Sequence, residues 1–416
     1  MNNRKIIIFF SLIFLIPFGS NADEILNYEE VSLYEQNYGE ENTLQNQIDS
    51  LKNQLTEIQS KQSRWEKYRE YLPKISGYLQ TGYNYNSVGE GLSTFQVKRL
   101  RLIIGGDINR FSYKIQLEGF NGVNVGSRWE KQKLIQILDA YAQYSFIDAL
   151  QLRVGQFSSP LGYENYLISP LTNVTIDYAC ICNKMVLRNA VGYAYSDYGR
   201  DLGIMLSGNL LSNIDGTPLI QYNIALTNGH LPSVNDNNKS KDIIASLTFW
   251  PTKLWNIKMA YNWGEYTPDS FSGNIATNTY PWNLVQGNKY IPLNRFIFGT
   301  WYNNPNGWYL RGEVGYQSSS YNKIKLVDEL GVYGLVAYNF SKWIPVARLD
   351  YFRDKVNPKF ADNRWRGLIG CSFVANSHIK VQLNYLLSRY TETAANFSNN
   401  GKRYSSELLI MGLFSF

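Results

Sequence analysis

The chain has 416 residues, of which 18% are charged, with a formal net charge of +6 and a mean hydropathy of −0.30. These values exclude a protein that crosses a membrane with many helices, because each helix needs about 20 consecutive apolar residues. They fit a transmembrane β-barrel, in which only alternate strand residues face lipid. The 32 Tyr, 20 Phe and 10 Trp favour this barrel over a soluble β-solenoid or sandwich, because aromatic rings gather at both membrane interfaces.

The first 22 residues are typical of a cleaved export signal. Arg4 and Lys5 precede an apolar run over residues 6–18, and Ser20-Asn21-Ala22 is a small-x-small cleavage site. The run is short for a transmembrane anchor, which is the alternative. Cleavage after Ala22 lowers the formal net charge from +6 to +4.

The next two segments differ in pattern. Residues 23–43 are polar and acidic and are predicted to form a flexible leader. Over residues 44–72, apolar residues follow steps of four and three, which is typical of a coiled-coil helix that ends before Pro73. The seam consists of Leu44, Ile48, Leu51, Leu55 and Ile58, continued by Gln62 and Trp65. Ile and Leu at both core positions favour a homotrimer with this helix in the periplasm; a solitary amphipathic helix is the alternative.

Short amphipathic segments, separated by clusters of Asn, Gly, Ser and Asp, fill the rest of the chain. We predict sixteen strands, at 75–86, 95–108, 111–120, 134–146, 150–157, 200–208, 218–228, 242–250, 256–264, 293–302, 308–317, 330–340, 345–353, 366–374, 379–390 and 404–416. The links are predicted to alternate strictly between short turns, such as 109–110, and long loops, such as 158–199. This pattern is typical of outer-membrane barrels. The fold class is therefore all-β, a transmembrane antiparallel β-barrel over residues 73–416.

Charged residues share one face of the predicted strands. A charge that faces lipid at mid-depth costs about 2–4 kcal/mol, so these faces must point into the barrel. The predicted lumen residues are the cations Arg99, Arg101, Lys114, Arg153, Lys258, Arg295, Arg311, Arg348 and Lys380, and the acids Asp107, Glu118, Asp139, Glu313 and Asp350. The surplus of cations predicts a preference for anions. The alternative is that pairs such as Arg311/Glu313 and Arg348/Asp350 neutralise the wall.

The last predicted strand is apolar on both faces. If Leu408 and Phe416 face lipid, then Leu409, Met411 and Leu413 face the lumen. Contact with a neighbouring subunit and contact with an inward-folded loop are the two explanations that the sequence leaves open.

Several short motifs resemble those of the phosphate-selective porin O and P family. They are Phe95–Leu102, Val154–Phe157 leading to Pro160–Glu164, Asn228-Gly229, and Arg348-Leu349-Asp350. The resemblance covers most of residues 75–416 and implies a sixteen-stranded trimeric porin whose third loop folds inward. Here that loop is 158–199, and it contributes Glu164, Lys184 and Arg188 to the expected constriction. The sequence departs from phosphate-selective members in lacking a dense arginine ladder and a lysine funnel.

The predicted function is a porin in the outer membrane of a Gram-negative bacterium, a water-filled channel through which small hydrophilic solutes diffuse. It is expected to prefer anions, with phosphate or polyphosphate as candidates. The expected partners are outer-membrane lipid, further copies of the chain and small anions, and no nucleic acid. The alternative is a closed structural or adhesive barrel that acts through its extracellular loops.

No enzyme, cofactor or metal site is expected. His230 and His378 belong to no recognisable nucleophile or metal motif. Cys180, Cys182 and Cys371 are an odd number, and the C-x-C spacing of the first two is poor for a mutual disulfide. We therefore expect the three cysteines to have no functional role.

Overall fold

The computed structural model describes residues 47–59, 71–119, 135–187, 199–229, 236, 238–266, 282–285, 288, 290–356 and 363–416. The chain divides into two units, Met1–Lys67 and Tyr68–Phe416. The predicted signal and leader lie outside the described residues, as do Leu44, Gln62 and Trp65 of the predicted seam.

In the first unit, residues 47–59 form a helix. The seam residues Ile48, Leu51, Leu55 and Ile58 are all exposed on it. The helix was predicted to continue to residue 72, but Tyr71 and Leu72 are not helical. No helix within the described ranges is long and apolar enough to cross a membrane.

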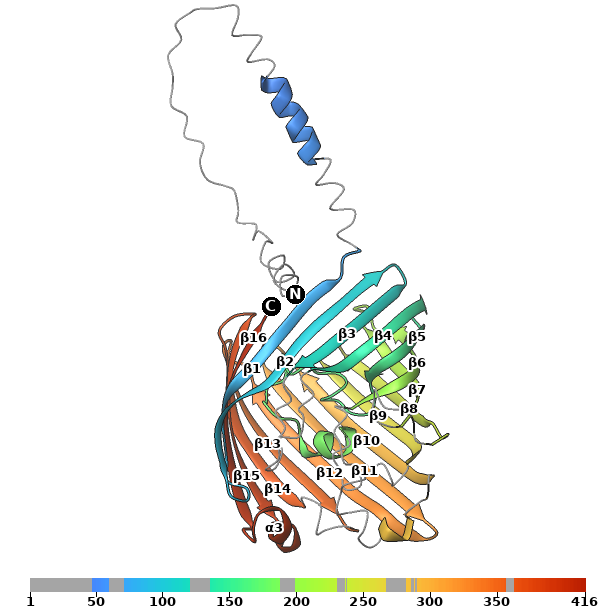
Figure 1. Ribbon diagram of the computed structural model, residues 1–416, viewed down its shortest axis with the longest axis vertical. Coiled ribbons are helices and arrows are strands. Elements are labelled where there is room, and N and C mark those ends of the chain that lie inside the picture. Colours follow the sequence, from blue (N-terminus) through green and yellow to red (C-terminus); the bar gives the residue numbers. More distant parts are fainter. Residues whose placement is uncertain are drawn as a thin grey trace, which may run out of the picture. The chain divides into compact units, whose positions relative to one another are not determined.

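The second unit contains a closed antiparallel barrel of sixteen strands, in which each strand pairs with its neighbours in sequence and β1 pairs with β16 (Figure 1). The strands are β1 (Lys74–Asn86), β2 (Leu92–Ile108), β3 (Phe111–Gly119), β4 (Ile135–Ile147), β5 (Leu150–Ser158), β6 (Arg200–Ser212), β7 (Pro218–Thr227), β8 (Asp242–Thr252), β9 (Trp255–Tyr266), β10 (Ile291–Asn303), β11 (Trp308–Tyr321), β12 (Ile324–Tyr338), β13 (Trp343–Asp354), β14 (Arg364–Val374), β15 (Ile379–Tyr390) and β16 (Tyr404–Ser415). Every predicted strand is therefore present.

The predicted strict alternation of link lengths is wrong at one place. Residues 318–329 were expected to be a loop, but β11 and β12 extend through them and meet at a tight turn. Asn322 and Lys323 occupy this turn with φ of 46° and 65°. Two central residues with positive φ fit the twist of a hairpin, but Lys at the second position is not a usual signal for such a turn.

Among the residues that the structure describes, the long links contain the short helices η1 (Cys182–Val186), η4 (Trp282–Val285) and α3 (Glu392–Ser398). In Figure 1, α3 lies at the end of the barrel opposite the C-terminus. We call the end with the short turns the short-turn rim and the end with α3 the long-loop rim.

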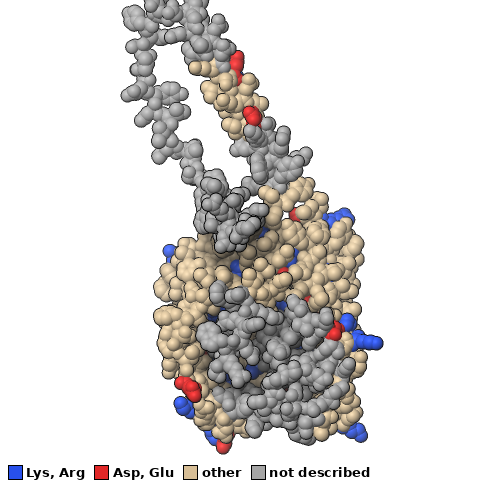
Figure 2. Space-filling view, viewed as in Figure 1, with Lys and Arg blue, Asp and Glu red and all other residues tan. Residues whose placement is uncertain are grey.

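The outer face of the barrel is apolar and the inner face is polar. Along β15, for example, Val381, Leu383 and Tyr385 are exposed, whereas Gln382 and Asn384 are buried. On the face drawn in Figure 2, most charged side chains lie along the edges of the barrel and the described wall between them is largely uncharged. This pattern matches a wall that contacts lipid.

The two apolar faces of β16 have an explanation inside the barrel. Leu409 and Met411 are fully buried and belong to the same hydrophobic cluster as Val174 and Ile176 of the loop between β5 and β6. Of the two explanations left open by the sequence, contact with an inward-folded loop is the one that the structure shows.

Candidate functional site

Residues 159–187, which we call the inserted segment, fill part of the barrel interior. Most of this segment is buried, and its hydrogen bonds run to inward side chains of β9, β11, β13 and β15. Loops normally lie on a protein surface because their backbone polar groups need partners. Here the barrel wall supplies those partners.

The start of the inserted segment is anchored to β9–β11. The Lys258 ammonium donates a hydrogen bond to the Gly162 carbonyl over 3.0 Å, and the Tyr163 N–H donates to the Glu313 carboxylate over 3.0 Å. The Tyr163 ring stacks on Trp301, with ring centroids 4.4 Å apart and planes tilted by 15°. The motif Pro160–Glu164 therefore joins the segment to the wall.

The middle of the segment is held by Arg348 and Asp350. The Arg348 guanidinium donates to the carbonyls of Asp177 at 2.8 Å and Tyr178 at 3.2 Å. The Asp350 carboxylate accepts the Cys180 N–H at 3.0 Å and pairs with Arg348 at 2.9 Å. Both charged side chains are fully buried. Removing one member of such a pair lowers the free energy of unfolding by about 3–5 kcal/mol.

Asn173 joins the segment to two strands. Its side-chain oxygen accepts a hydrogen bond from Arg311 at 3.0 Å, and its carbonyl accepts from Lys380 at 2.9 Å and from Gln382 at 3.2 Å. Lys380 also donates to the Leu171 carbonyl at 2.6 Å. Two predicted lumen cations therefore bind backbone and amide oxygens of the segment.

A pair of inward glycines makes room for Ile181. Gly315 of β11 lies opposite Gly331 of β12. A Cβ at Gly315 would lie 2.6 Å from the Ile181 side chain, and one at Gly331 would lie 3.1 Å from it. Because any side chain here would meet Ile181, the two glycines let the segment approach the wall.

The segment also contacts β2. Lys98 pairs with Asp177 at 2.6 Å, and Arg99 donates to the Ile176 carbonyl at 3.4 Å and to the Gln80 side chain. Burial by itself would raise the pKa of the Asp177 carboxyl, but Lys98 and Arg99 outweigh it and lower the pKa to about 2. Asp177 is therefore charged at neutral pH.

The three predicted constriction residues have different environments. Glu164 is fully buried and accepts the Ala179 N–H at 2.6 Å within the segment. Burial raises the pKa of this carboxyl above its usual value, although Arg348 opposes the effect. Lys184 is half-buried, with its ammonium 5.8 Å from the centre of the Phe352 ring. Arg188 lies outside the described residues.

Two predicted lumen cations on β3 and β5 are half-exposed. Lys114 pairs with Asp139 at 2.7 Å, and its side chain is 32% exposed. Arg153 donates twice to the Gln143 side chain, at 2.9 and 2.7 Å, and lies 4.3 Å from the centre of the Tyr141 ring. The inserted segment covers neither of these cations in the way that it covers the cations of β9–β15.

The remaining predicted lumen residues are paired within the wall or close to it. Arg101 pairs with Glu118, and both are buried. Arg295 donates to Met185 of the inserted segment at 3.0 Å and lies 3.6 Å from Asp242. Asp107 is exposed and lies 3.8 Å from Lys74.

The two pairs that the sequence suggested as neutralising partners differ. Arg348 and Asp350 form an ion pair. Arg311 and Glu313 show no ion pair within the described residues: Arg311 donates to Asn303 and Asn173, whereas Glu313 accepts from Tyr163.

Sequence reasoning missed Lys98, Asn173 and Tyr163. Lys98 was missed because a β-bulge between Gln80 and Thr81 shifts the register of β2 and breaks the period-two alternation there. Asn173 and Tyr163 lie in a loop, where no periodicity indicates the direction of a side chain. The motifs around residues 95–102, 160–164 and 348–350 were the available signal, because the second joins the inserted segment to the wall and the other two contact the segment.

The cysteines are unbridged. Cys180 and Cys182 are buried in the inserted segment, and Cys371 is half-buried on β14. Among the residues that the structure describes, no group of three His, Cys, Asp or Glu side chains could hold a metal ion. His230 lies outside those residues.

Comparison with known families gives one match: residues 75–317 match the model of the phosphate-selective porin O and P family. Among curated protein sequences, none matches this chain. The match spans more than half of the chain and includes the inserted segment with its anchors on β9, β10 and β11.

Solved structures of outer-membrane porins share the fold. OprB of Pseudomonas putida has a TM-score of 0.59 at 10% identity, covering 84% of this chain and 96% of its own. An anion-selective porin from Comamonas acidovorans has a TM-score of 0.58 at 9% identity, covering 83% and 99%. Salmonella typhi OmpF has a TM-score of 0.55 at 12% identity, covering 83% and 97%. At these identities the likeness concerns the fold alone.

Proposed function

We propose that this chain, which belongs to the phosphate-selective porin O and P family, conducts small anions through the part of its barrel that the inserted segment leaves open. As a porin, it forms a channel across the outer membrane of a Gram-negative bacterium. The narrower proposal concerns which solutes pass and which residues they meet.

The observation that carries the proposal is the asymmetry of the lumen. The inserted segment binds the wall of β9–β15 and buries Lys258, Arg311, Arg348 and Lys380. On the opposite side, Lys114 of β3 and Arg153 of β5 are only partly covered. A solute path therefore runs between the segment and β3–β5, and the segment is its constriction.

The charge along this path supports anion preference. Lys114 and Arg153 are half-buried, so their charges reach the solvent of the lumen. Cations that line a pore attract anions and raise the barrier for other cations. Phosphate and polyphosphate are the candidate solutes implied by the family. Conduction by such a path needs neither a catalytic group nor a cofactor.

The orientation follows from barrel architecture. Outer-membrane barrels carry short turns on the periplasmic side and long loops outside. We therefore place the short-turn rim, where β1 begins and β16 ends, in the periplasm, with a cleaved signal at 1–22 and an acidic leader at 23–43. The exposed seam Ile48, Leu51, Leu55 and Ile58 needs a partner, and three copies of the helix would provide one in a homotrimer.

The test is the zero-current reversal potential of purified protein in a planar bilayer under a KCl gradient. An anion-signed potential, together with a conductance that added phosphate blocks, supports the proposal. A potential near zero with large conductance contradicts anion preference, and absence of conductance would favour a closed adhesive barrel. The oligomeric state is measured separately, by mass photometry of the full-length chain and of a chain that begins at residue 68.

A further inference from the structure

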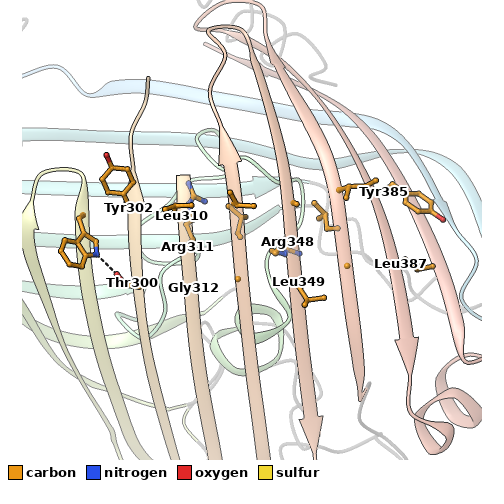
Figure 3. A pocket seen from close by; sticks show the side chains of 17 residues that line it. Thr300, Tyr302, Leu310, Arg311, Gly312, Arg348, Leu349, Tyr385 and Leu387 are labelled. Atoms are coloured by element: carbon orange, nitrogen blue, oxygen red, sulfur yellow. Dashed lines mark hydrogen bonds between the residues drawn. The ribbon is translucent and has the colours of Figure 1, made fainter. Parts of the chain in front are cut away.

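A long apolar groove runs over the outer wall of the barrel between β9 and β15. It has a volume of about 1080 Å³ and is lined on its outward side by residues such as Leu310, Val336, Leu349, Ile369 and Leu387. Figure 3 shows Leu310, Leu349 and Leu387 on three strands of the same wall, with Gly312 on the strand of Leu310. The groove faces the region that lipid occupies in an outer-membrane barrel.

Outward glycines form the floor of the groove. Gly312 lies opposite Gly334, Gly334 opposite Leu349, and Leu349 opposite Gly367. A Cβ at Gly334 or Gly367 would meet nothing within 4 Å, and one at Gly312 would meet only a backbone oxygen at 3.5 Å. No packing within the described chain requires these glycines.

The inward glycines of the same strands are different, because Ile181 of the inserted segment occupies the space over Gly315 and Gly331. The outward glycines leave a hollow that no described residue fills. A flexible apolar chain from the membrane fits such a hollow, because no side chain projects from the glycines into it.

A second hollow, the rim pocket, lies beyond the groove at the long-loop rim. It has a volume of about 650 Å³ and lies between the ends of β13, β14 and β15 and the start of α3. The cations that line it are Arg353, Lys355, Arg364, Arg389 and Arg403, against the acids Asp354 and Glu392. The rim pocket therefore has a net positive charge.

Several of these cations lack an anionic partner. Within the described ranges, no acidic side chain pairs with Arg353, Lys355 or Arg389, and the Arg353 Nε is buried without a hydrogen-bond partner. Arg403 pairs with Glu392 at 2.8 Å, but both side chains are more than half exposed, at 55% and 74%. The rim pocket can therefore accept further negative charge.

The groove and the rim pocket follow each other on the same strands. Leu349, Gly367 and Leu387 of the groove form one row across β13–β15, paired through the sheet. Tyr351, Trp365 and Arg389 of the rim pocket form the next row on the same face, two residues further along each strand. Two residues of a strand span about 6.6 Å. An elongated molecule can thus reach from one hollow into the other.

We propose that the groove and the rim pocket together bind one phosphorylated lipid of the outer leaflet, with an acyl chain over the glycine floor and a phosphate among Arg353, Lys355 and Arg389. Charge complementarity carries this assignment. Arginine pairs with phosphate through two parallel hydrogen bonds, and Tyr351 and Trp365, whose ring centroids are 4.6 Å apart, are ring types that lie at the level of lipid headgroups.

The depth of the cations also fits a lipid headgroup. A lipid-facing Arg or Lys is costly at the membrane midplane, and the penalty almost disappears near the interface. Arg353 and Arg389 are each the penultimate residue of their strands, β13 and β15, so they lie at the interface. The assignment of the long-loop rim to the outer leaflet rests on the orientation given under the proposed function.

The experiment measures lipid retained by full-length protein. Protein purified in detergent is incubated with bisphosphorylated lipid A, washed, and analysed by native mass spectrometry. The variant R353A/R389A removes the proposed phosphate contacts, and G334L/G367L fills the groove from two positions where a Cβ meets nothing within 4 Å. R110A is the matched control, because Arg110 is an exposed arginine of the short-turn rim. Heat-modifiable migration shows that each variant is folded.

We expect each double variant to retain lipid A about tenfold or more weakly than wild type, and R110A to equal wild type. Dephosphorylated lipid A should bind to wild type as weakly as lipid A binds to R353A/R389A. Equal retention by wild type and by both double variants would overturn the proposal, as would equal binding of dephosphorylated lipid. Conductance of wild type in bilayers without lipid A tests the channel separately, so the two proposals can fail independently.

Discussion

Two walls of this barrel carry similar side chains in different surroundings. Lys114, Arg153, Lys258 and Arg311 are each the fourth residue of a strand that begins at the short-turn rim, so they lie at a similar depth. The Lys114 side chain is 32% exposed, whereas Lys258 and Arg311 are 2% and 5% exposed. Because depth and charge are matched, the inserted segment accounts for the difference.

The comparison shows that an inward cation can serve either of two purposes. On β9–β15 it donates hydrogen bonds to a loop that would otherwise leave its carbonyls without partners inside the barrel. On β3 and β5 it remains in contact with water. Counting lumen charges therefore overstates the charge that a passing solute meets.

The largest effect on stability is expected from Arg348→Ala. It leaves Asp350 buried without its partner and frees the carbonyls of Asp177 and Tyr178, so the free energy of unfolding should fall by about 3–5 kcal/mol. Conductance should rise, because the middle of the inserted segment loses its anchor. Urea unfolding in detergent and single-channel recording measure both. Arg153→Ala on the opposite wall is the control, and equal effects of the two substitutions would contradict the distinction between the walls.

A smaller effect is expected from Gly331→Val. The new side chain meets Ile181, and such overpacking costs about 1–3 kcal/mol. Gly334→Val on the outer face of the same strand is the matched control, since a Cβ there meets nothing within 4 Å. Thermal unfolding should show a lower transition temperature for the first variant only. If both variants unfold at the same temperature, the inner wall does not hold the segment as described.

A pH-dependent effect is expected from Asp177→Asn, at about 1–2 kcal/mol. Folding lowers the pKa of Asp177 to about 2, so its contribution is complete above the unfolded value and disappears as the pH falls through about 2. The stability difference between wild type and variant should therefore stay constant from pH 7 to about 5. A difference that already vanishes at pH 5 would show that Lys98 does not hold this carboxylate.

The smallest effect on stability, but a large one on selectivity, is expected from K114E/R153E. Arg153 is half-exposed, and the buried Asp139 keeps Arg200 as a partner when Lys114 is replaced, so the free energy of unfolding should fall by about 1 kcal/mol. The reversal potential under a KCl gradient should shift toward cations, since two positive charges of the path become negative. Arg110→Glu, at the exposed turn between β2 and β3, is the control. An unchanged potential in K114E/R153E would place the conducting path elsewhere.

The sequence by itself determined the sixteen strands and the direction of most of their side chains. Both depend on local rules: period-two alternation, turn residues, and the cost of placing a charge in lipid. The rules failed where local geometry departs from them, at the turn of Asn322 and Lys323 and at the bulge that turns Lys98 inward.

Only the tertiary structure decided which inward cations face water. Arg348 meets Tyr178 across 170 residues of sequence, and Lys380 meets Asn173 across 207 residues. The path of the inserted segment depends on many such contacts together, with Ile181 fitting between Gly315 and Gly331. No periodicity in the sequence describes that path, because a loop has none, and so the selection of Lys114 and Arg153 over Lys258 and Arg311 required the folded barrel.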